Sequence, residues 1–296
     1  MRLSIVHETH YLYESPVLVS QQLLHLTPRV LERQRFAAHR IDIDPMPSEY
    51  DVGTDYFGNP VTRALFAMPH TALSVRASSQ ATIVPRAADP LAAPSTPWQQ
   101  VRDRLSSLDD PPLLEPTEFI FESQYVEIFG ALAEYAAPSF PAGAGILQAS
   151  ADLMRRIHAD FVFDDAATVV ATPLREVLKL QRGVCQDFAH LMIGALRALG
   201  LPARYVSGYI LTSPPPGYPR LVGADASHAW VSVYDPAAGW FDFDPTNACL
   251  ADDEHVTIAW GRDFGDVTPM RGVILGGGEH TLRVHVTVTP VESGHG

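Results

Sequence analysis

The sequence predicts an α+β protein in two parts, an N-terminal antiparallel β-sandwich at residues 1–110 and an α+β core at residues 111–296. Three observations support this prediction. Alternating side chains fill much of the first third of the chain, seven prolines interrupt residues 85–116, and a helical apolar pattern precedes several strand patterns in the remainder. Short strands followed by helices and further strands are typical of α+β architecture.

Composition and charge narrow the class of protein. The chain has 296 residues, of which 46% are hydrophobic, and 34 acidic residues against 21 basic ones give a formal net charge of −13. This balance is typical of a folded protein, and its sign disfavours nucleic acid and anionic membranes as partners. No stretch is apolar enough to cross a bilayer, and the first residues lack the apolar core of a signal peptide, so we expect a cytoplasmic protein.

The first part of the chain carries two alternating patterns. Residues of one parity within 3–13 form a run of strand-favouring types, and residues 72–84 place their apolar side chains on one face. Residues 57–60 between them have turn chemistry. The prolines from residue 85 onward then indicate a connection between domains, in which residues 98–108 could form a short helix.

Three helices are expected in the second part. Residues 145–161 repeat apolar side chains at close to helical spacing, and residues 172–180 begin with Thr172 as a capping residue and Pro173 in the first turn. Residues 183–200 carry a strongly apolar pattern and end at Gly200, a common helix stop. This third helix is apolar enough to be buried, and Cys185 lies at its start.

Strands are expected after these helices. Residues 203–211, 228–234 and 239–244 have the composition of β-strands. Near the end of the chain, residues 282–288 alternate apolar and polar side chains, which predicts a half-buried strand that either closes the core or bridges to the first part. The glycines at 276–278 lack the context of a phosphate loop and indicate a turn.

Three residues of these elements could act together. Cys185 would open a helix, where unpaired N–H groups and the helix dipole stabilise a thiolate. His228 and Asp244 would lie on neighbouring strands about 4.8 Å apart, close enough to share a hydrogen bond. A thiol, an imidazole and an orienting carboxylate suit nucleophilic catalysis. The alternatives are a buried core cysteine, a structural histidine beside Trp230 and an aspartate that starts a turn.

Four segments extend this pattern into a resemblance to a known family. They resemble the bacterial transglutaminase-like superfamily, and more narrowly its soluble branch with an extra N-terminal β domain. The segments are RGVCQDFAH at residues 182–190, PARYVSGY at 202–209, DASHAW at 225–230 and GWFDFDPTN at 239–247. In addition, residues 56–59 and 73–83 resemble the N-terminal domain, and residues 255–266 and 269–278 resemble the C-terminal signature of this branch.

The resemblance implies a papain-like core, in which the helix that carries the nucleophile packs on an antiparallel sheet. It also implies a Cys-His-Asp triad, with Cys185 as the nucleophile, His228 as base and then acid, and Asp244 as the orienting acid. The implied reaction forms a thioester from an amide or peptide carbonyl. Water would complete hydrolysis, as in a cysteine protease or amidase, whereas an amine acceptor would make the protein an acyltransferase or a protein-glutamine transamidase.

Other residues are candidates for binding substrate or supporting the triad. The backbone N–H of Cys185 should form part of an oxyanion hole, because a carbonyl attacked at a helix N-terminus meets it directly. Gln124 or Tyr125 is a candidate for a further donor, with ordinary surface positions as the alternative. Asp225 and Ser227 precede the predicted base and could position it through hydrogen bonds.

A second group of candidates follows the predicted base. Trp230 shares a strand face with the histidine and could shield it from water, or simply belong to the core. His255, Arg262, Asp263 and Asp266 form a polar cluster in the sequence, in which Arg262 could bind a substrate carboxylate through two hydrogen bonds. An internal salt bridge from Arg262 to Asp263 or Asp266 is the alternative.

Two other functions compete with that of a thiol enzyme. Cys185, His190, His228 and Cys249 could bind a metal, but closely paired ligands are missing, so neither a metal nor another cofactor is expected. The chain could also be a non-catalytic protein-interaction scaffold, which an intact triad disfavours. We expect a peptide or protein as substrate and leave self-association into a homo-oligomer open.

Overall fold

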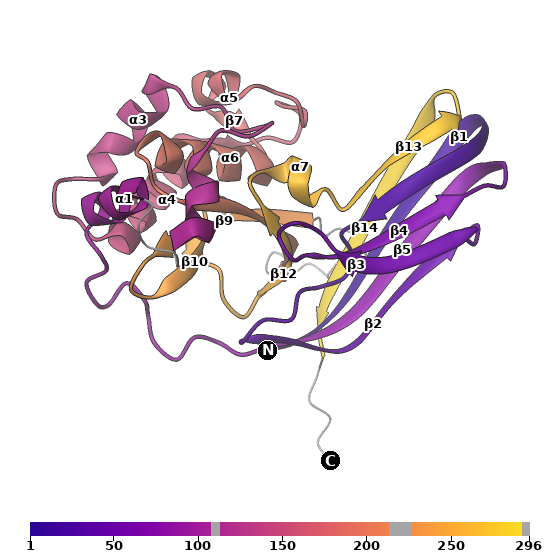
Figure 1. The fold of residues 1–296 in the computed structure, drawn as a ribbon, viewed down its shortest axis with the longest axis horizontal. Helices are drawn as coiled ribbons and strands as arrows, with labels where there is room; N and C mark the ends of the chain where they lie inside the picture. The colour runs from indigo at the N-terminus through magenta and orange to yellow at the C-terminus, as the bar shows by residue number, and fades with distance from the viewer. Residues whose placement is uncertain (108–112, 213–226, 292–296) are drawn as a thin grey trace, which may run out of the picture.

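The computed structural model describes residues 1–107, 113–212 and 227–291. They form two parts that Figure 1 shows side by side, a β-sheet built mainly from N-terminal strands and a core in which helices pack on a second sheet. The predicted α+β class is therefore confirmed. The predicted boundary between residues 110 and 111 lies outside the described residues.

The first sheet contains seven antiparallel strands. Five come from the start of the chain in the order β2-β5-β1-β4-β3, and two from its end pair with β1. The strands are β1 Arg2–Leu24, β2 Gln34–Asp44, β3 Glu49–Thr54, β4 Pro60–Phe66, β5 His70–Ile83, β13 Met270–Gly276 and β14 His280–Pro290. Strand pairing therefore places residues 270–290 with the N-terminal strands rather than in the core, which is the bridging alternative for the last predicted strand.

Strand β1 is longer than the sequence predicts because it serves both halves of this sheet. Its first half pairs with β5 and β14, and its second half with β4 and β13. The register is irregular between Leu12 and Val17. The chain between β13 and β14 turns there through Gly276, Gly277 and Gly278, whose positive φ angles only glycine adopts freely. Strands β4 and β5 lie on opposite sides of β1, yet their side chains meet in one apolar cluster. The sheet therefore bends along β1, and one continuous sheet stands where a two-sheet sandwich was expected.

The core combines helices with a five-stranded antiparallel sheet in the order β11-β10-β9-β8-β12. Its strands are β8 Ala203–Ile210, β9 Ser227–Asp235, β10 Gly239–Asp244, β11 Cys249–Leu250 and β12 His255–Gly261. Two short strands, β6 Val162–Phe163 and β7 Arg182–Gly183, pair in parallel. The helices are α1 Trp98–Ser107, α2 Leu114–Thr117, η2 Glu118–Ile120, α3 Gly130–Ala136, η3 Ala137–Ser139, α4 Ile146–Asp160, α5 Leu174–Leu180, α6 Cys185–Ala198 and α7 Phe264–Val267.

Helix α6 lies at the centre of the core. Its residues from Asp187 to Arg197 are all buried, and it packs on β8, β9, α3, α4 and α5. Because it lacks a polar face, its stability comes from this packing. In the neighbouring α5, Pro173 rather than Thr172 occupies the N-cap, because the Thr172 hydroxyl accepts a hydrogen bond from the preceding turn. Among the described residues, no helix has the length and hydrophobicity that a bilayer crossing requires.

One hydrophobic cluster joins the two parts. Leu3 and Ile5 of β1 and Val286 of β14 belong to the same cluster as Tyr209 of β8 and Val256 of β12. The first sheet is therefore packed against the core rather than tethered to it by a linker. Burial of this shared apolar surface favours the association of the two parts.

Two side-chain amides of the first part hold the outer edge of β12. Gln34 donates to the Thr257 carbonyl at 2.7 Å and accepts from the Thr257 N–H at 2.8 Å. Asn59 makes the same pair of hydrogen bonds to the Trp260 backbone, at 2.8 and 2.9 Å. Each amide takes the place of a neighbouring strand residue and satisfies backbone groups that an edge strand leaves open. The first sheet thus fixes the position of β12.

We predict that Asn59→Ala lowers the free energy of unfolding by about 1–3 kcal/mol, because it leaves the buried Trp260 backbone groups without partners. Urea unfolding at neutral pH measures the change. The control is Gln80→Ala at an exposed position of β5, which should cost no more than about 0.5 kcal/mol. Equal costs for the two variants would show that the amide does not secure β12.

Candidate active site

The start of helix α6 is set by the residues around Cys185. Asp187 Oδ2 accepts hydrogen bonds from the Val184 N–H at 2.8 Å and from the Thr168 hydroxyl at 2.6 Å, which holds the chain before the helix. Gly183 leaves room for this carboxylate, since a Cβ there would lie 2.5 Å from Asp187 Oδ2. The Cys185 side chain is consequently held, partly exposed, at the positive end of the helix dipole.

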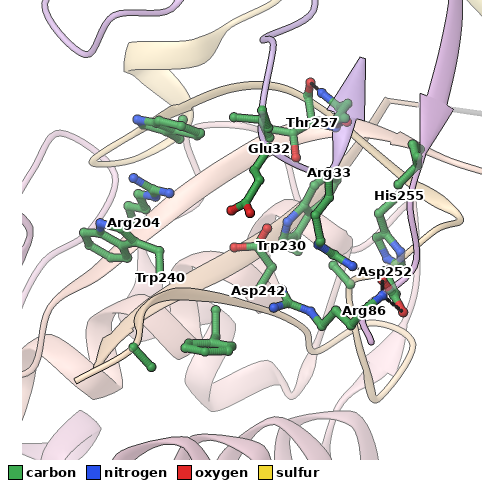
Figure 2. Close-up of a pocket in the computed structure, with 17 residues that line it drawn as sticks. Glu32, Arg33, Arg86, Arg204, Trp230, Trp240, Asp242, Asp252, His255 and Thr257 are labelled. Carbon is green, nitrogen blue, oxygen red and sulfur yellow. Dashed lines mark hydrogen bonds and ion pairs between the residues drawn. The ribbon is translucent and has the colours of Figure 1, made fainter. Parts of the chain in front are cut away.

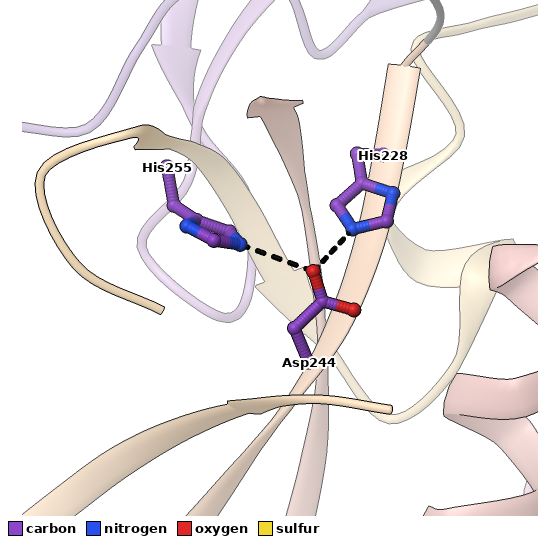
Figure 3. Close-up of side chains that lie close together, drawn as sticks. All are labelled: His228, Asp244 and His255. Carbon is purple, nitrogen blue, oxygen red and sulfur yellow. Dashed lines mark hydrogen bonds and ion pairs between the residues drawn. The ribbon is translucent and has the colours of Figure 1, made fainter. Parts of the chain in front are cut away.

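Strands β9 and β10 bring His228 and Asp244 together. The two strands are antiparallel neighbours, with Phe243 opposite Val231. His228 Nε2 lies 2.7 Å from Asp244 Oδ2. Figure 3 shows the two side chains facing each other. Because a carboxylate only accepts, Nε2 carries the hydrogen of this bond. Both side chains are buried, so the bond is shielded from water.

The Cys185 thiol also affects the pKa of His228. Burial alone would lower the pKa of His228, but hydrogen bonds to Asp244 and to Cys185 outweigh it and raise the pKa from 6.5 to about 10. Since Nε2 is bonded to Asp244, Nδ1 is the ring nitrogen that remains for the sulfur. The site therefore favours the imidazolium form, which is the form that pairs with a thiolate.

Five hydrogen bonds hold the Asp244 carboxylate. Oδ2 accepts from His228 and from His255 Nε2 at 3.1 Å, both drawn in Figure 3, and also from Asn247 Nδ2 at 2.7 Å. Oδ1 accepts from the backbone N–H groups of Thr246 at 2.9 Å and Asn247 at 3.2 Å. Burial raises the pKa of this carboxyl, but the hydrogen bonds lower it more, and the pKa stays below its usual range. The group is therefore ionised at neutral pH although none of its surface is exposed.

Comparison with family models identifies this arrangement. Residues 144–245, which include Cys185, His228 and Asp244, match the transglutaminase-like superfamily. Residues 3–82 match the bacterial transglutaminase-like N-terminal region. The chain belongs to the transglutaminase-like superfamily. The second match spans most of strands β1 to β5, so the first sheet and the transglutaminase-like core are the two modules that the resemblance implied.

One relative and one solved structure match nearly the whole chain, and a further relative matches a short segment. An uncharacterised protein of Mycobacterium tuberculosis is 39% identical over 296 residues, 98% of this chain and 93% of that protein. A 65-residue segment is 43% identical to a protein-glutamine gamma-glutamyltransferase of Pseudomonas aeruginosa, which is 22% of this chain and 10% of the relative. A crystal structure of a candidate cysteine protease from Cytophaga hutchinsonii shares the fold, with a TM-score of 0.75, 20% identity, and coverage of 99% of this chain and 91% of its own.

His255 is a residue of the transglutaminase-like site whose contact with Asp244 the sequence did not reveal. The predicted polar cluster at 255–266 separates in space, and His255 alone of its four members bonds to Asp244. Its ring also packs at 82° on Trp230, with ring centroids 5.2 Å apart. The residue begins β12, which lies at the opposite edge of the sheet from β11. Periodicity along the chain carries no signal for such a contact between distant strands.

Three further residues were predicted to support His228, and each is placed differently. Trp230 is completely buried, and its ring centroid lies 6.0 Å from that of His228, so it is both a core residue and a neighbour of the site. Ser227 begins β9 opposite Tyr209. Asp225 lies outside the described residues.

The remaining members of the polar cluster bond to each other or to nearby backbone groups. Arg262 donates to both carboxylate oxygens of Asp266, each at 2.9 Å, which is the internal salt bridge left open by the sequence. Asp263 caps helix α7 by accepting from the Gly265 N–H at 2.8 Å, and its other oxygen accepts from the Tyr125 N–H at 2.8 Å. These bonds order the segment that follows β12.

Gln124 and Tyr125 lie beside this segment. The Tyr125 ring stacks on that of His190 from helix α6, with centroids 6.0 Å apart, while Gln124 is exposed near Gly265. Tyr205 lies close enough to Cys185 and to Asp263 for both to affect its pKa. Burial, and then the charges of Cys185, Asp187 and Asp263, raise the pKa of its phenol well above 10.0.

The four residues of the alternative metal site, Cys185, His190, His228 and Cys249, do not form one cluster of ligand atoms in the described ranges. His190 accepts a hydrogen bond from a backbone N–H of α7 at 3.2 Å, and Cys249 lies opposite Asp244 across β10 and β11. Within the described ranges, the one group of such ligand atoms that lies within 4.8 Å comprises His228, Asp244 and His255. There the Asn247 amide already donates to the shared Asp244 oxygen, where a cation would have to replace it. The donor set fits a hydrogen-bonded triad better than a metal centre.

We predict that the His228 pair stabilises the fold in a defined pH window. A pKa raised from 6.5 to about 10 means that the folded state binds more protons between these values. The stabilisation is therefore complete below about pH 6.5 and is lost as the pH rises toward 10. Because a Cys185 thiolate would release a proton that offsets the one His228 gains, the test uses the Cys185→Ala background. Its free energy of unfolding in urea should fall more steeply across this window than that of Cys185→Ala with His228→Gln, which keeps an N–H donor but does not titrate. Parallel curves for the two proteins would contradict the raised pKa.

Proposed function

We propose that this chain is a thiol-dependent amide or peptide-bond hydrolase, or an acyltransferase, that acts through a thioester. The main support is the hydrogen bond between His228 and Asp244, together with the effect of Cys185 on the pKa of His228 and the position of its thiol at the start of a buried helix. Membership of the transglutaminase-like superfamily supports the same class of chemistry. In this proposal Cys185 is the nucleophile, His228 transfers protons, and Asp244 orients His228.

In the first step, the Cys185 thiolate attacks the carbonyl carbon of an amide. The C–S bond forms, the C–N bond breaks, and the leaving amine takes a proton from the His228 imidazolium. Charge that develops on the carbonyl oxygen is stabilised by the N–H of Cys185, one of the first-turn groups without an acceptor inside the helix. Gln124 remains a candidate for a further donor, because the Tyr125 N–H already donates to Asp263.

In the second step, neutral His228 takes a proton from the acceptor that attacks the thioester. Water releases a carboxylic acid and restores the thiol, whereas a primary amine releases a new amide. Hydrolysis of a peptide or protein is our leading proposal. Transamidation is the alternative, supported by the local similarity to a protein-glutamine gamma-glutamyltransferase. A small molecule with an amide carbonyl would meet the same chemistry.

We predict that iodoacetamide labels Cys185 of the wild type rapidly at about pH 6, as a histidine-paired thiolate requires. His228→Ala should slow this labelling about tenfold or more, because the variant lacks the imidazolium that would stabilise the thiolate. Mass spectrometry of the labelled peptide gives the rate between about pH 5 and 9.

Cys249 provides the internal control for this measurement. Burial, and then the charges of Asp244 and Glu254, raise the pKa of its thiol to about 11. It should therefore stay unlabelled near neutral pH, and Cys249→Ser should leave the Cys185 rate unchanged. Slow labelling of Cys185 in the wild type, with the pH dependence of an ordinary thiol, would contradict the proposed nucleophile and favour the non-catalytic scaffold.

We predict that water is the acceptor when the protein acts on a peptide library. Each product pair should then contain one added water per cleaved bond, detected by mass spectrometry. A fluorescent primary amine in the same mixture distinguishes transamidation, in which the amine enters a glutamine side chain and ammonia leaves. Cys185→Ala should abolish either product. Amine incorporation without cleavage would overturn hydrolysis and establish the alternative.

A further inference from the structure

Asp244 is shared by two histidines. Its Oδ2 atom accepts from His228 Nε2 at 2.7 Å and also from His255 Nε2 at 3.1 Å. His255 is 7% exposed, and its other nitrogen, Nδ1, is buried without a hydrogen-bond partner among the described residues. Within these residues, the polar function of its ring is therefore directed at Asp244. An apolar side chain would fill this buried position without the cost of burying an imidazole, unless the hydrogen bond itself is needed.

His255 also separates Asp244 from a pocket. Figure 2 shows His255 at the wall of this pocket, which has a volume of about 320 Å³ and lies between the two parts of the molecule. Arg33 and Gln34 line it from the first part, and Trp230 and Thr257 line it from the core. Asp244 is 0% exposed and does not line the pocket. The imidazole thus lies between the carboxylate and the space behind it.

We propose that His255 is a positioning residue that holds the Asp244 carboxylate toward His228 and closes it off from this pocket. The proposal rests on the proposed function, because it gives His255 a role in the same thiol chemistry. Among the described residues, His255 donates its side-chain hydrogen bond to Asp244 and not to His228, whose ring centroid lies 6.1 Å from its own. Its hydrogen bond therefore acts on His228 through Asp244. The consequence is that a side chain of β12 controls the thiolate at the start of α6.

The proposed effect has a physical route. Without the His255 donor, Asp244 loses one of the bonds that keep its pKa low and its Oδ2 atom in place. The carboxylate can then turn away from His228 or accept hydrogen bonds from water in the pocket. Either change weakens its hold on the His228 imidazolium, and a weaker imidazolium leaves less thiolate at Cys185. The rate of Cys185 alkylation therefore measures the role of His255 without a known substrate.

Two substitutions separate hydrogen bonding from packing. His255→Gln retains an N–H that can donate to Asp244, and we expect its Cys185 alkylation rate at about pH 6 to stay within about threefold of wild type. His255→Phe fills the space without a donor, and we expect a rate about tenfold lower, the scale for one lost hydrogen bond to a charged group. Circular dichroism and the melting temperature establish that both variants are folded.

Chemical rescue provides the sharpest test, since the pocket lies directly behind the ring. His255→Ala joins the vacated volume to the pocket, so added imidazole can enter and donate to Asp244. Imidazole should raise the alkylation rate of folded His255→Ala several-fold, in a saturable way, and leave the wild-type rate unchanged. A purely structural role would not respond to a small molecule added after folding.

His70 is a comparable residue outside the site. It is 9% exposed in the first sheet, and one of its nitrogens bonds to a carbonyl at 3.0 Å while the other is buried without a partner among the described residues. His70→Phe should therefore reproduce the general cost of replacing such a histidine. We expect it to change stability but not the alkylation rate of Cys185.

The outcomes distinguish the two proposals. Failure of the wild-type protein to show a histidine-dependent thiolate would overturn the proposed function. A wild-type rate that depends on His228 but is unchanged in folded His255→Phe would overturn the role of His255 alone. Equal losses in the Gln and Phe variants, with no rescue by imidazole, would show that His255 acts by packing and would also overturn the proposal.

Discussion

The burial of one carboxylate, that of Asp244, constrains the whole site. An ionised carboxylate removed from water costs several kcal/mol unless donors replace its hydration. Here the five hydrogen bonds come from β9, from the turn after β10 and from the start of β12. Satisfying this charge therefore fixes three segments relative to one another. The same bonds that make the charge tolerable also orient His228, so stability and chemistry depend on one set of contacts.

This constraint extends into the first sheet through β12. Gln34 and Asn59 bond to the backbone of that strand at Thr257 and Trp260, and His255 lies at its start. A strand held on its outer edge by two amides has little freedom to shift its register. The N-terminal region thus contributes to the geometry of the core without a side chain of its own at the thiol. This gives a physical reason for the two modules to occur in one chain.

The sequence was informative where local patterns decide the structure. Helices α4 and α6 and strands β8 to β10 follow from periodicity and end residues such as Gly200, because neighbours along the chain set their exposure. Cys185, His228 and Asp244 could be named because each lies in a motif at the end of such an element. Strand β12 was not predicted, because residues 255–266 were assigned only to a polar cluster and a family signature. The contact of His255 with Asp244 depends on sheet order, which a single sequence does not display.

The same inability to see pairing between distant strands explains why only the first part of β1 was predicted. Its first half alternates between buried and partly exposed residues, but the second half pairs with different strands after an irregular register near Leu12. Strands β13 and β14 pair with β1 across almost the whole length of the chain. Of these two, only β14 carried an alternating pattern in the sequence. Arg262 illustrates the opposite case, in which charge alone left two partners open and the distance to Asp266 decided between a substrate contact and an internal pair.

The pKa of His228 is raised and that of Asp244 is lowered by the same interaction between the two groups. Each group is buried, and burial alone would favour its neutral form. Their mutual hydrogen bond reverses this, raising the pKa of His228 to about 10 and holding that of Asp244 below its usual range. The ion pair therefore persists across the whole neutral pH range, and Cys185 always faces an imidazolium there. In the proposed mechanism, any donor that stabilises Asp244, including one from a distant strand, would consequently act on the Cys185 thiol through His228.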